Sequence, residues 1–425
     1  MDTWRAPSAS GPVRARVRLP GSKSITNRAL VLAALSEQPS IVVGGLDARD
    51  TRLAVAALRA LGTSITTGVD DWAVSPGTAG AGPVDVDLGN SGTCMRFLPG
   101  VAALTSAHVR FDGDPRIRER PVGALLGALR EAGVAVDGDA VPFTVHGRGR
   151  VPGGAVELDA SGSSQLVSGL LLAAASFDTG LSVRHVGPEV PSAPHIAMTV
   201  RMLRAAGVLV EESGGARPAC WRVEPGPVQA GTIVVEPDLS NAAPFLAAAL
   251  VTSGTIEIPH WPAPADSLQA SGQILDVLTR MGAAVSVDAA GLTISGTGVV
   301  RGITADLRDV AELAPVLACV AASAADSPSV FTGLAHTRTH ETDRLAALAK
   351  ELNDLGGSVS ETPDGLHITP ATLRPSRAFD TYDDHRMVMA AAALGLVVPG
   401  LDVLNAATVG KTFPSFTEVW ESMLA

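Results

Sequence analysis

A repeat of roughly 70 residues is the feature of this chain that most constrains its fold. Five times, an apolar helical pattern ends at a glycine and runs into a β-rich segment, and these glycines lie 71 to 75 residues apart. They are Gly62, Gly133, Gly207, Gly282 and Gly356. Glycine is expected at the left-handed position that ends a helix, and the turn-rich stretches that follow predict a hairpin after each glycine.

Two further series of segments share this period. Six short β-rich segments lead into polar loops: IVVGG, HVRFDG, SVRHVG, TIEIP, SVFTG and LDVLN. Six polar turns lead into helices rich in alanine and leucine: GSKSITNR, GNSGTCMR, SGSSQ, DLSNAA, DVAELA and YDDHRM. Ordinary α/β alternation could produce one such series, but three series with one period indicate six copies of a folding unit.

The two ends of the chain are related by this repeat. The sixth unit has no hairpin of its own, because its last helical pattern, EVWESMLA, ends the sequence. Near the start, WRAP, SASG and VRARVRL read as strand, turn and strand. We therefore expect the N-terminal residues to complete the sixth unit.

Length and composition limit the classes of protein that fit. A chain of 425 residues can build two sizeable cores, and its net charge of −11 argues against broad nucleic-acid binding. The three cysteines are scattered, which fits a reducing cytosol and matches no zinc site. The start lacks a signal-peptide pattern, and no apolar run reaches the roughly 18 residues of a membrane span. We expect a soluble cytoplasmic protein.

Positive charge is concentrated in a few turns. The chain has only three lysines against 29 arginines. Lys350 lies in the helical pattern AALAKELNDL and reads as solvated surface, whereas Lys23 and Lys411 lie in the polar turns GSKSITNR and VGKTFPSF. A compact ammonium in a turn suits anion binding or proton transfer better than chance surface decoration.

Other polar side chains gather in the same turns. They are Asn90, Gly92, Thr93 and Arg96, then Arg116, Arg118 and Arg120, then Ser163, Ser164 and Gln165, and finally His336, His340, Glu341, Arg344, Asp384, His385 and Arg386. Helix N-termini bind anions through free N–H groups, so these turns predict a site for phosphorylated small molecules. Helix capping alone would explain SGSSQ or YDDHR taken singly. VGKTF lacks the first glycine of a phosphate-binding P-loop, and HETDR lacks the second histidine of a zinc protease.

Together these motifs resemble the EPSP synthase (3-phosphoshikimate 1-carboxyvinyltransferase) family. The resemblance runs in order from Pro20 to about Phe416 through PGSKSITNRALVLAAL, GNSGTCMR, RERP, SSQ, PSAPHIAM, HETDRL, DDHRM and GKTFPSF. PGSKSxxNRAL and GNxGT are specific to this family, whereas SSQ or GKT alone would not be.

The resemblance implies an α/β (α+β) fold of two similar domains, each with three βαβαββ units arranged as an inside-out α/β barrel. One domain would span 21–235, and the other 236–425 plus 1–20, with the active site in the cleft between them. A monomer is expected.

The resemblance also implies a reaction. The family transfers the enolpyruvyl group of phosphoenolpyruvate to the 5-hydroxyl of shikimate 3-phosphate and releases phosphate, on the route to chorismate and aromatic amino acids. These two small molecules are the expected partners, and neither a metal nor an organic cofactor is expected.

Site residues carried over from the family fall into three sets. The expected catalytic residues are Lys23, Glu312 and Glu341. The expected shikimate 3-phosphate contacts are Lys23, Ser24, Arg28, Ser163, Ser164, Gln165, Ser192, Glu312, His336 and His340. The expected phosphoenolpyruvate contacts are Lys23, Gly92, Arg120, Gln165, Arg344, Arg386 and Lys411. We expect Glu341 in the first turn of a helix, where the dipole favours a carboxylate, and Glu312 in an apolar run.

The chain departs from the better-known members at several of these positions. Glu312 replaces the usual aspartate, His340 a usual lysine and His336 a usual asparagine. A neutral imidazole would hold an anion less firmly than a lysine does, and it could titrate near 6.5. Gly92 is retained where alanine marks glyphosate-tolerant forms, so we expect inhibition by glyphosate.

Two alternatives remain open from the sequence. The sister enzyme that transfers enolpyruvyl to UDP-N-acetylglucosamine typically uses a loop cysteine as acid, and no cysteine here lies in such a loop. A non-catalytic anion-binding homologue would be expected to lack Lys23, Glu341 or Lys411, all of which are present.

Overall fold

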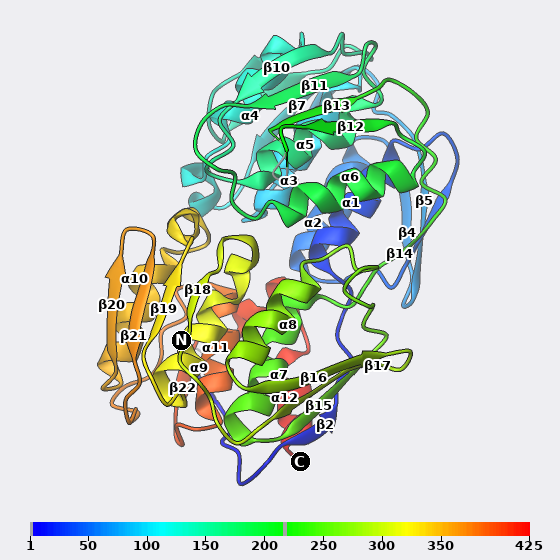
Figure 1. Ribbon diagram of the computed structural model, residues 1–425. Helices are drawn as coiled ribbons and strands as arrows, with labels where there is room; N and C mark the ends of the chain where they lie inside the picture. Colours follow the sequence, from blue (N-terminus) through cyan, green and yellow to red (C-terminus); the bar gives the residue numbers. More distant parts are fainter. Residues whose placement is uncertain (1–2, 216–218) are drawn as a thin grey trace. The chain divides into compact units, whose positions relative to one another are not determined.

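The computed structural model describes residues 3–215 and 219–425, which form two compact units (Figure 1). The first, called here the central unit, is Gly21–Val235. The second, called the terminal unit, joins the described residues up to Pro20 to Glu236–Ala425.

The central unit contains six α-helices and twelve strands among its described residues. Its helices are α1 (Lys23–Ala34), α2 (Arg49–Ala60), α3 (Gly92–Ala103), α4 (Gly123–Glu131), α5 (Ser164–Ala174) and α6 (Pro194–Ala205), with the 3₁₀ helix η1 (Pro115–Glu119). Its strands are β3 (Ser40–Val43), β4 (Ser64–Thr67), β5 (Asp71–Ser75), β6 (Gly82–Asp87), β7 (Ala107–Asp112), β8 (Ala135–Asp137), β9 (Phe143–His146), β10 (Gly154–Leu158), β11 (Leu181–His185), β12 (Val210–Ser213), β13 (Cys220–Val223) and β14 (Thr232–Val234).

The terminal unit is built in the same way. Its helices are α7 (Leu239–Thr252), α8 (Ser271–Arg280), α9 (Ala314–Ser323), α10 (Arg344–Asp354), α11 (His385–Gly395) and α12 (Phe416–Leu424), with the 3₁₀ helices η2 (Arg308–Leu313), η3 (Ala335–Thr339) and η4 (Ala406–Lys411). Its strands are β1 (Thr3–Arg5), β2 (Arg14–Arg16), β15 (Thr255–Pro259), β16 (Ala283–Asp288), β17 (Gly291–Gly296), β18 (Thr304–Asp306), β19 (Ser329–Thr332), β20 (Ser358–Thr362), β21 (Gly365–Thr369) and β22 (Asp402–Leu404).

Each four-stranded sheet follows one pattern, which the order β6-β7-β9-β8 illustrates. The first two strands are parallel, as the crossover helix between them requires, and the last two form an antiparallel hairpin. The same pattern gives β10-β11-β13-β12 and β18-β19-β21-β20. The predicted repeat of strand, helix, strand, helix and hairpin is therefore present in both units.

The five predicted helix terminators have the expected backbone. Gly62, Gly133, Gly207, Gly282 and Gly356 all have positive φ, between 81° and 112°. At Gly62 and Gly282 an added Cβ would also collide with backbone carbonyl groups, of Thr78 and Val299 respectively. Glycine is thus required there both by its φ angle and by the close approach of another segment.

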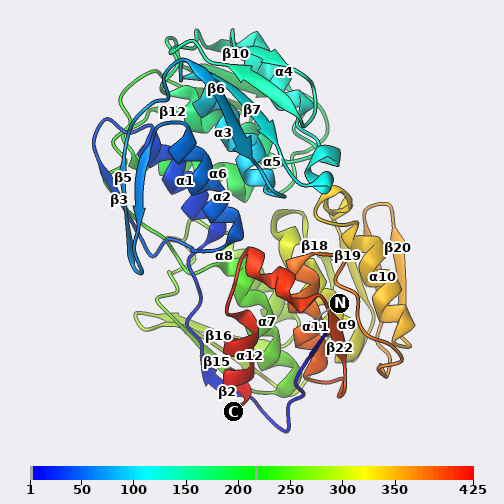
Figure 2. The same cartoon turned by 180° about the vertical axis from the view of Figure 1, so that it is seen from behind.

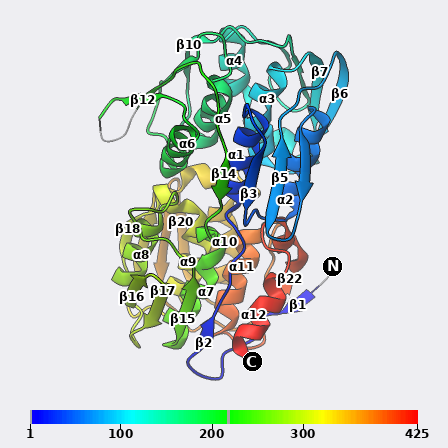
Figure 3. The same cartoon turned by 90° about the vertical axis from the view of Figure 1, so that its right-hand side faces the viewer.

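The N-terminal residues pair differently from the expectation. Strand β1 does extend the sixth unit, because it runs antiparallel to β22 with Trp4 opposite Val403 (Figure 3). Strand β2, however, pairs in parallel with β15 of the fourth unit rather than with β1. The expected N-terminal hairpin was wrong, because a local turn signal predicts a turn but does not decide which sheet edge a strand will pair with.

Strand β14 makes the reciprocal exchange. It precedes α7 in the chain, yet it pairs in parallel with β3 of the central unit. The chain passes from one unit to the other after Pro20 and again after Val235. The strand just before each passage, β2 and β14 respectively, pairs within the unit that the chain is leaving.

Three buried helices form the interior of each unit. Helices α1, α3 and α5 pack against one another in the central unit, and α7, α9 and α11 do so in the terminal unit, seen from behind in Figure 2. Every residue of α3 and of α11 is buried, whereas α2 and α8 bury one face only. The α/β fold class is confirmed, with apolar helices inside and sheets outside. Among the described residues, no helix has the length and apolar character needed to cross a membrane.

Candidate active site

In the central unit, the N-terminal ends of the three buried helices lie together. At the start of α3, the Cys94 Sγ is 3.9 Å from the carbonyl oxygen of Asp50, whose carboxylate lies 3.9 Å from the Nζ of Lys23 at the start of α1. A second link joins α3 to α5, because the Nη1 of Arg96 donates to the Oε1 of Gln165 at 2.9 Å. The positive ends of three helix dipoles therefore reinforce one another at one place, which favours an anion.

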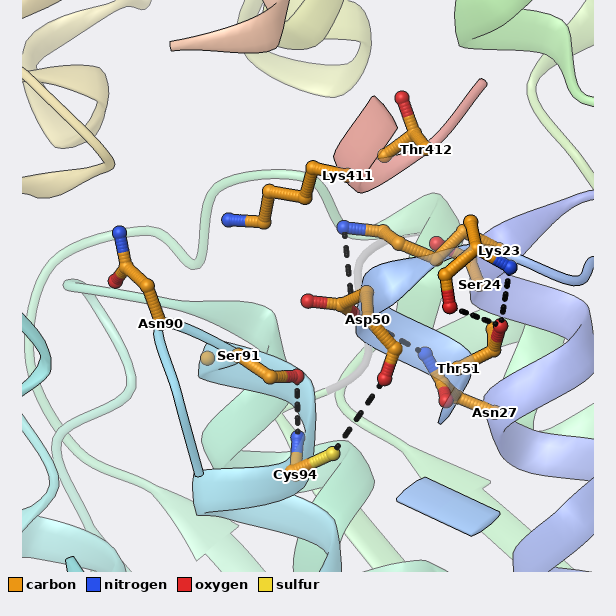
Figure 4. Close-up of polar contacts among 12 residues, drawn as sticks. Lys23, Ser24, Asn27, Asp50, Thr51, Asn90, Ser91, Cys94, Lys411 and Thr412 are labelled. Carbon is orange, nitrogen blue, oxygen red and sulfur yellow. Dashed lines mark hydrogen bonds and ion pairs between the residues drawn. The ribbon is translucent and has the colours of Figure 1, made fainter. Parts of the chain in front are cut away.

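Lys23 is held by a carboxylate that the sequence did not single out. Figure 4 shows its ammonium group directed toward the carboxylate of Asp50. The side chain of Lys23 is 17% exposed, and that of Asp50 is 2% exposed. Asp50 also accepts a long hydrogen bond of 3.5 Å from the Nδ2 of Asn27, one turn further along α1. This buried anion fixes the direction of the ammonium group while leaving part of it accessible.

The cysteines are unsuited to acid–base or nucleophilic chemistry. Burial raises the pKa of Cys94 to about 12, and the same cause raises the pKa of Cys319 to about 12. The N-cap hydroxyl of Ser91 accepts a hydrogen bond from the Cys94 backbone N–H, so this cysteine lies inside a capped helix start (Figure 4). Cys220 lies in strand β13. None of the three occupies the exposed loop in which a catalytic cysteine is expected.

Gly92 is packed beneath two arginines. An added Cβ would lie 2.9 Å from the Nη1 of Arg96 and closer still to the guanidinium of Arg120. Arg120 is buried and donates to the carbonyl oxygen of Asn90 at 3.3 Å, while its Nε has no hydrogen-bond partner among the described residues. The absence of a side chain at Gly92 thus leaves room for a guanidinium at a helix N-terminus.

Arg28 is buried, unlike an arginine on the surface that would bind an anion from solvent. It is 1% exposed, and it donates to the side chains of Thr199 and Ser168 and to the backbone oxygens of Ser24 and His195, at 2.7 to 3.2 Å. Burial lowers its pKa to about 9, so it remains charged at neutral pH. These bonds join α1 to α5 and α6, and the charge lies one turn behind Ser24.

The serine turn begins α5, and Ser192 precedes α6. Ser163 is the N-cap of α5, and its hydroxyl accepts from the backbone N–H of Gln165 at 3.3 Å. Ser164 is the first residue of the helix and is buried. Ser192 has a positive φ of 52°, and its carbonyl accepts from the N–H of His195. The predicted capping role of SGSSQ is therefore present, and it places these hydroxyls at one helix start.

The terminal unit brings a carboxylate between two cations. One oxygen of Glu341 pairs with the Nζ of Lys411, and the other accepts from the Nη2 of Arg344 at 3.2 Å. The side chains of Glu341 and Lys411 are 8% and 9% exposed. Glu341 precedes Asp343, the N-cap of α10, so the expectation that it lies in the first helical turn was wrong. Its negative charge is balanced by the side chains of Lys411 and Arg344, and Glu341 is not part of the helix whose dipole was expected to stabilise it.

Arg344 is fixed on its other side by Asp384. The two guanidinium–carboxylate bonds measure 2.8 and 3.2 Å, and both side chains are almost fully buried. Although burial opposes the charge, Asp384 and Glu341 raise the pKa of Arg344 above its ordinary value. Asp384 also caps α11 by accepting from the backbone N–H of Arg386.

Arg386 is the least satisfied of these cations. It is 4% exposed, its Nη1 donates to the Sδ of Met389 at 3.6 Å, and its Nε has no hydrogen-bond partner among the described residues. Burial lowers its pKa, and the nearby carboxylates of Asp238 and Glu312 act in the opposite direction. A buried guanidinium with spare donors is suited to an anionic ligand.

The histidines lie in the segment before α10. The rings of His336 and His340 make an edge-on contact with centroids 5.6 Å apart, and the Nη1 of Arg344 lies 3.2 Å from the Nδ1 of His340. Burial lowers the pKa of His336, and Glu312, which lies in η2 before the apolar helix α9, opposes this shift.

The expected residues thus form two sets, one in each unit. The central unit holds Lys23, Ser24, Arg28, Gly92, Arg120, Ser163, Ser164, Gln165 and Ser192, and the terminal unit holds Glu312, His336, His340, Glu341, Arg344, Arg386 and Lys411. Sequence reasoning missed Asp50, which lies in DARDTR and becomes a partner of Lys23 only through folding. Within the described ranges, no group of three or more His, Cys, Asp or Glu side chains is placed to hold a metal ion.

Comparison with known protein families identifies the family to which this chain belongs. The family model described as EPSP synthase (3-phosphoshikimate 1-carboxyvinyltransferase) matches residues 7–420. The chain belongs to the EPSP synthase family.

Solved structures agree with this membership. Two structures of EPSP synthase from Acinetobacter baumannii are similar, with 26% and 25% sequence identity and a TM-score of 0.79. In both cases 99% of this chain and 98% of the other chain are covered. The enolpyruvyl transferase NikO from Streptomyces tendae has 19% identity and a TM-score of 0.76, covering 98% of this chain and 96% of NikO, which shows a shared fold.

Membership in the EPSP synthase family gives the activity. The chain is a 3-phosphoshikimate 1-carboxyvinyltransferase, which acts on phosphoenolpyruvate and shikimate 3-phosphate in the shikimate pathway towards aromatic amino acids. Transfer to UDP-N-acetylglucosamine is not favoured, in agreement with the buried state of Cys94 and Cys319.

Proposed function

We propose that both units contribute residues to one enolpyruvyl transfer site. Shikimate 3-phosphate is bound by a first set of residues: Lys23, Ser24, Arg28, Ser163, Ser164, Gln165, Ser192, Glu312, His336 and His340. Phosphoenolpyruvate is bound by a second set: Lys23, Gly92, Arg120, Gln165, Arg344, Arg386 and Lys411. The gathered helix starts and the buried, incompletely bonded guanidinium groups of Arg120 and Arg386 support this division.

Glu341 carries the proton transfer at carbon. The observation that supports this role most strongly is its position between Lys411 and Arg344, with little exposure to water. An ammonium paired with a carboxylate offers a donor and an acceptor at one place, as the reaction of phosphoenolpyruvate requires. Glu312 takes the proton of the 5-hydroxyl, and Lys23 balances the phosphate charge.

The methylene carbon of phosphoenolpyruvate gains a proton from the ammonium–carboxylate pair of Lys411 and Glu341, and the adjacent carbon becomes oxocarbenium-like. The oxygen of the 5-hydroxyl bonds to that carbon while its proton goes to Glu312. The bond between that carbon and the phosphate oxygen then breaks, and the methyl carbon returns a proton to Glu341. The departing phosphate takes the proton that Glu312 holds. The products are 5-enolpyruvylshikimate 3-phosphate and inorganic phosphate.

The test is phosphate release from the purified protein mixed with both substrates. We expect Lys23→Ala and Glu341→Gln to slow turnover by roughly 10²–10⁴-fold, the usual contribution of acid–base groups. Arg52→Ala and Glu37→Gln are control variants on exposed positions and should leave the rate unchanged. Full activity in both Lys23→Ala and Glu341→Gln would refute these assignments while leaving the enzyme class intact.

Glyphosate provides a test of the phosphoenolpyruvate side of the site. Because Gly92 leaves the space beneath Arg120 open, we expect glyphosate to inhibit the enzyme in competition with phosphoenolpyruvate. Steady-state rates at low phosphoenolpyruvate with increasing inhibitor measure this. Normal turnover in excess glyphosate would contradict the expectation.

A further inference from the structure

The loop before α11 has a strained backbone. Tyr382 and Asp383 are consecutive non-glycine residues with positive φ, 52° and 56°. Residues other than glycine rarely adopt this left-handed backbone conformation. Two such residues in succession persist only where the surrounding structure holds them. Strain of this kind occurs most often at functional sites, so the contacts that maintain it are informative.

Helix α10 holds one side of the loop through Glu351. This side chain is 1% exposed, and its Oε1 accepts from the hydroxyl of Tyr382 at 2.6 Å and from the Nη2 of Arg377 at 2.7 Å. Its Oε2 accepts from the backbone N–H of Asp380 at 3.0 Å. A buried carboxylate with three donors on one loop is a firm anchor.

The segment of β22 and η4 holds the other side. The backbone oxygen of Asp383 accepts from the Oγ1 of Thr408 at 3.0 Å, and its carboxylate accepts from the side-chain amide of Asn405. The Oγ1 of Thr381 donates to the carbonyl oxygen of Leu404 at 2.9 Å. The helix η4 that begins here ends at Lys411.

The loop leads directly to Asp384, which binds Arg344 and caps the helix that carries Arg386. The three elements that carry Arg344, Arg386 and Lys411 are therefore all bonded to one short loop.

We propose that Tyr382 and Glu351 are positioning residues for phosphoenolpyruvate binding. Their hydrogen bond keeps the strained loop in the conformation that aligns Arg344, Arg386 and Lys411. This proposal rests on the assignment of those three cations to phosphoenolpyruvate. Neither Tyr382 nor Glu351 is expected to touch the substrate.

The test compares KM values for the two substrates in Tyr382→Phe, which removes only the hydroxyl. We expect the KM for phosphoenolpyruvate to rise roughly tenfold, as for the loss of one buried hydrogen bond. The KM for shikimate 3-phosphate should change by less than about twofold, because the loop holds only the cations assigned to phosphoenolpyruvate. Glu351→Gln keeps the shape of the side chain but replaces one acceptor oxygen with a donor. It should also raise the KM for phosphoenolpyruvate, and it provides the test if Tyr382→Phe folds poorly.

Thr297→Val is the matched structural control. It removes a hydroxyl that donates to the carbonyl oxygen of Gly282 at 2.7 Å in the same unit, away from the loop. It should lower the Tm and leave both KM values unchanged. A lower Tm in Tyr382→Phe with an unchanged KM for phosphoenolpyruvate, or an equal rise in both KM values, would overturn the proposal.

Arg344→Lys, measured in parallel, separates the positioning role from the assignment of Arg344 to phosphoenolpyruvate binding. If Arg344→Lys raises the KM for phosphoenolpyruvate and neither Tyr382→Phe nor Glu351→Gln does, the positioning role alone is wrong. If Arg344→Lys has no effect on that KM, the assignment of the cation fails and the positioning role fails with it.

Discussion

At the scale of single residues, the site depends on charges that are buried but not fully satisfied. Arg120 and Arg386 keep donors without protein partners among the described residues, whereas Arg28 and Arg344 are bonded on several sides. A guanidinium with unbonded donors can bind a ligand, whereas a fully bonded guanidinium mainly holds the neighbouring residues in place. The same residue type therefore serves two purposes, which only its contacts distinguish.

Gly92 provides a direct test of the space left for Arg120. We expect Gly92→Ala to raise the KM for phosphoenolpyruvate roughly tenfold or more, because the new methyl group would displace two guanidinium groups. Gly127→Ala is the matched control, since an added Cβ on α4 meets nothing within 4 Å. It should leave KM unchanged and slightly raise the Tm. Equal KM values in the two variants would contradict this account.

His336 should make stability depend on pH. Burial lowers its pKa below 6.5 in the folded chain, so the unfolded chain binds a proton more readily than the folded chain does. The free energy of unfolding should therefore rise with pH up to about 6.5, and the destabilisation should be complete below the folded pKa. His336→Asn should flatten this part of a urea-unfolding profile. The exposed control His367→Asn should keep the slope of the parent, and an unchanged slope in His336→Asn would count against the prediction.

At the scale of elements, the site is a set of helix starts. Helices α1, α3 and α5 are buried on nearly all sides and begin with polar turns, so burying the helices brings the turns together. In the terminal unit the N-caps of α7, α10 and α11 are the aspartates Asp238, Asp343 and Asp384. These caps satisfy backbone donors that an anion would otherwise use, so anion binding there depends more on side-chain cations.

Arg28 tests how firmly these helices are joined. We expect Arg28→Lys to lower the free energy of unfolding of the central unit by about 2–3 kcal/mol, because a lysine cannot reproduce the four bonds of the planar fork. The urea midpoint measures this change. Arg52→Lys is the control on an exposed arginine of the same unit and should change the midpoint little. Equal midpoints would show that the network contributes nothing to stability.

At the scale of the whole molecule, each unit has its own interior and its own complete sheets. All strands of the three sheets in the central unit come from Gly21–Val235, including β14 at its end. The catalytic residues that we propose are divided, since Lys23 belongs to this unit and Glu341 to the other. Folding is thus expected to be local to each unit, and catalysis to need both.

A fragment of residues 21–235 tests this separation. We expect it to unfold cooperatively on heating, because about 200 residues can bury an adequate core. It should release no phosphate from the two substrates, because it lacks Glu341, Arg344 and Lys411. A fragment of residues 21–228 lacks β14 and exposes the edge of β3, so it should have a lower Tm and aggregate more readily. Turnover by the 21–235 fragment would refute the divided site.

Local patterns in the sequence were enough to predict a large part of this protein. The glycine helix ends, the five hairpins that follow them and the polar helix starts are each predicted by patterns of a few residues, and their recurrence predicts the repeat; the structure has them where expected. The family follows from motifs of the same short range, and the matching family model agrees.

Contacts between distant segments were decided only by the tertiary structure. Asp50 beside Lys23, the burial of Arg28, the pairing of β2 with β15 and the bond between Glu351 and Tyr382 join residues that no short pattern relates. Glu341 lies outside the helix in which we expected it, and it contacts Lys411, which is 70 residues away in sequence. Hydrogen bonds and ion pairs depend on distance in space, and chain folding sets that distance through the packing of whole helices and sheets.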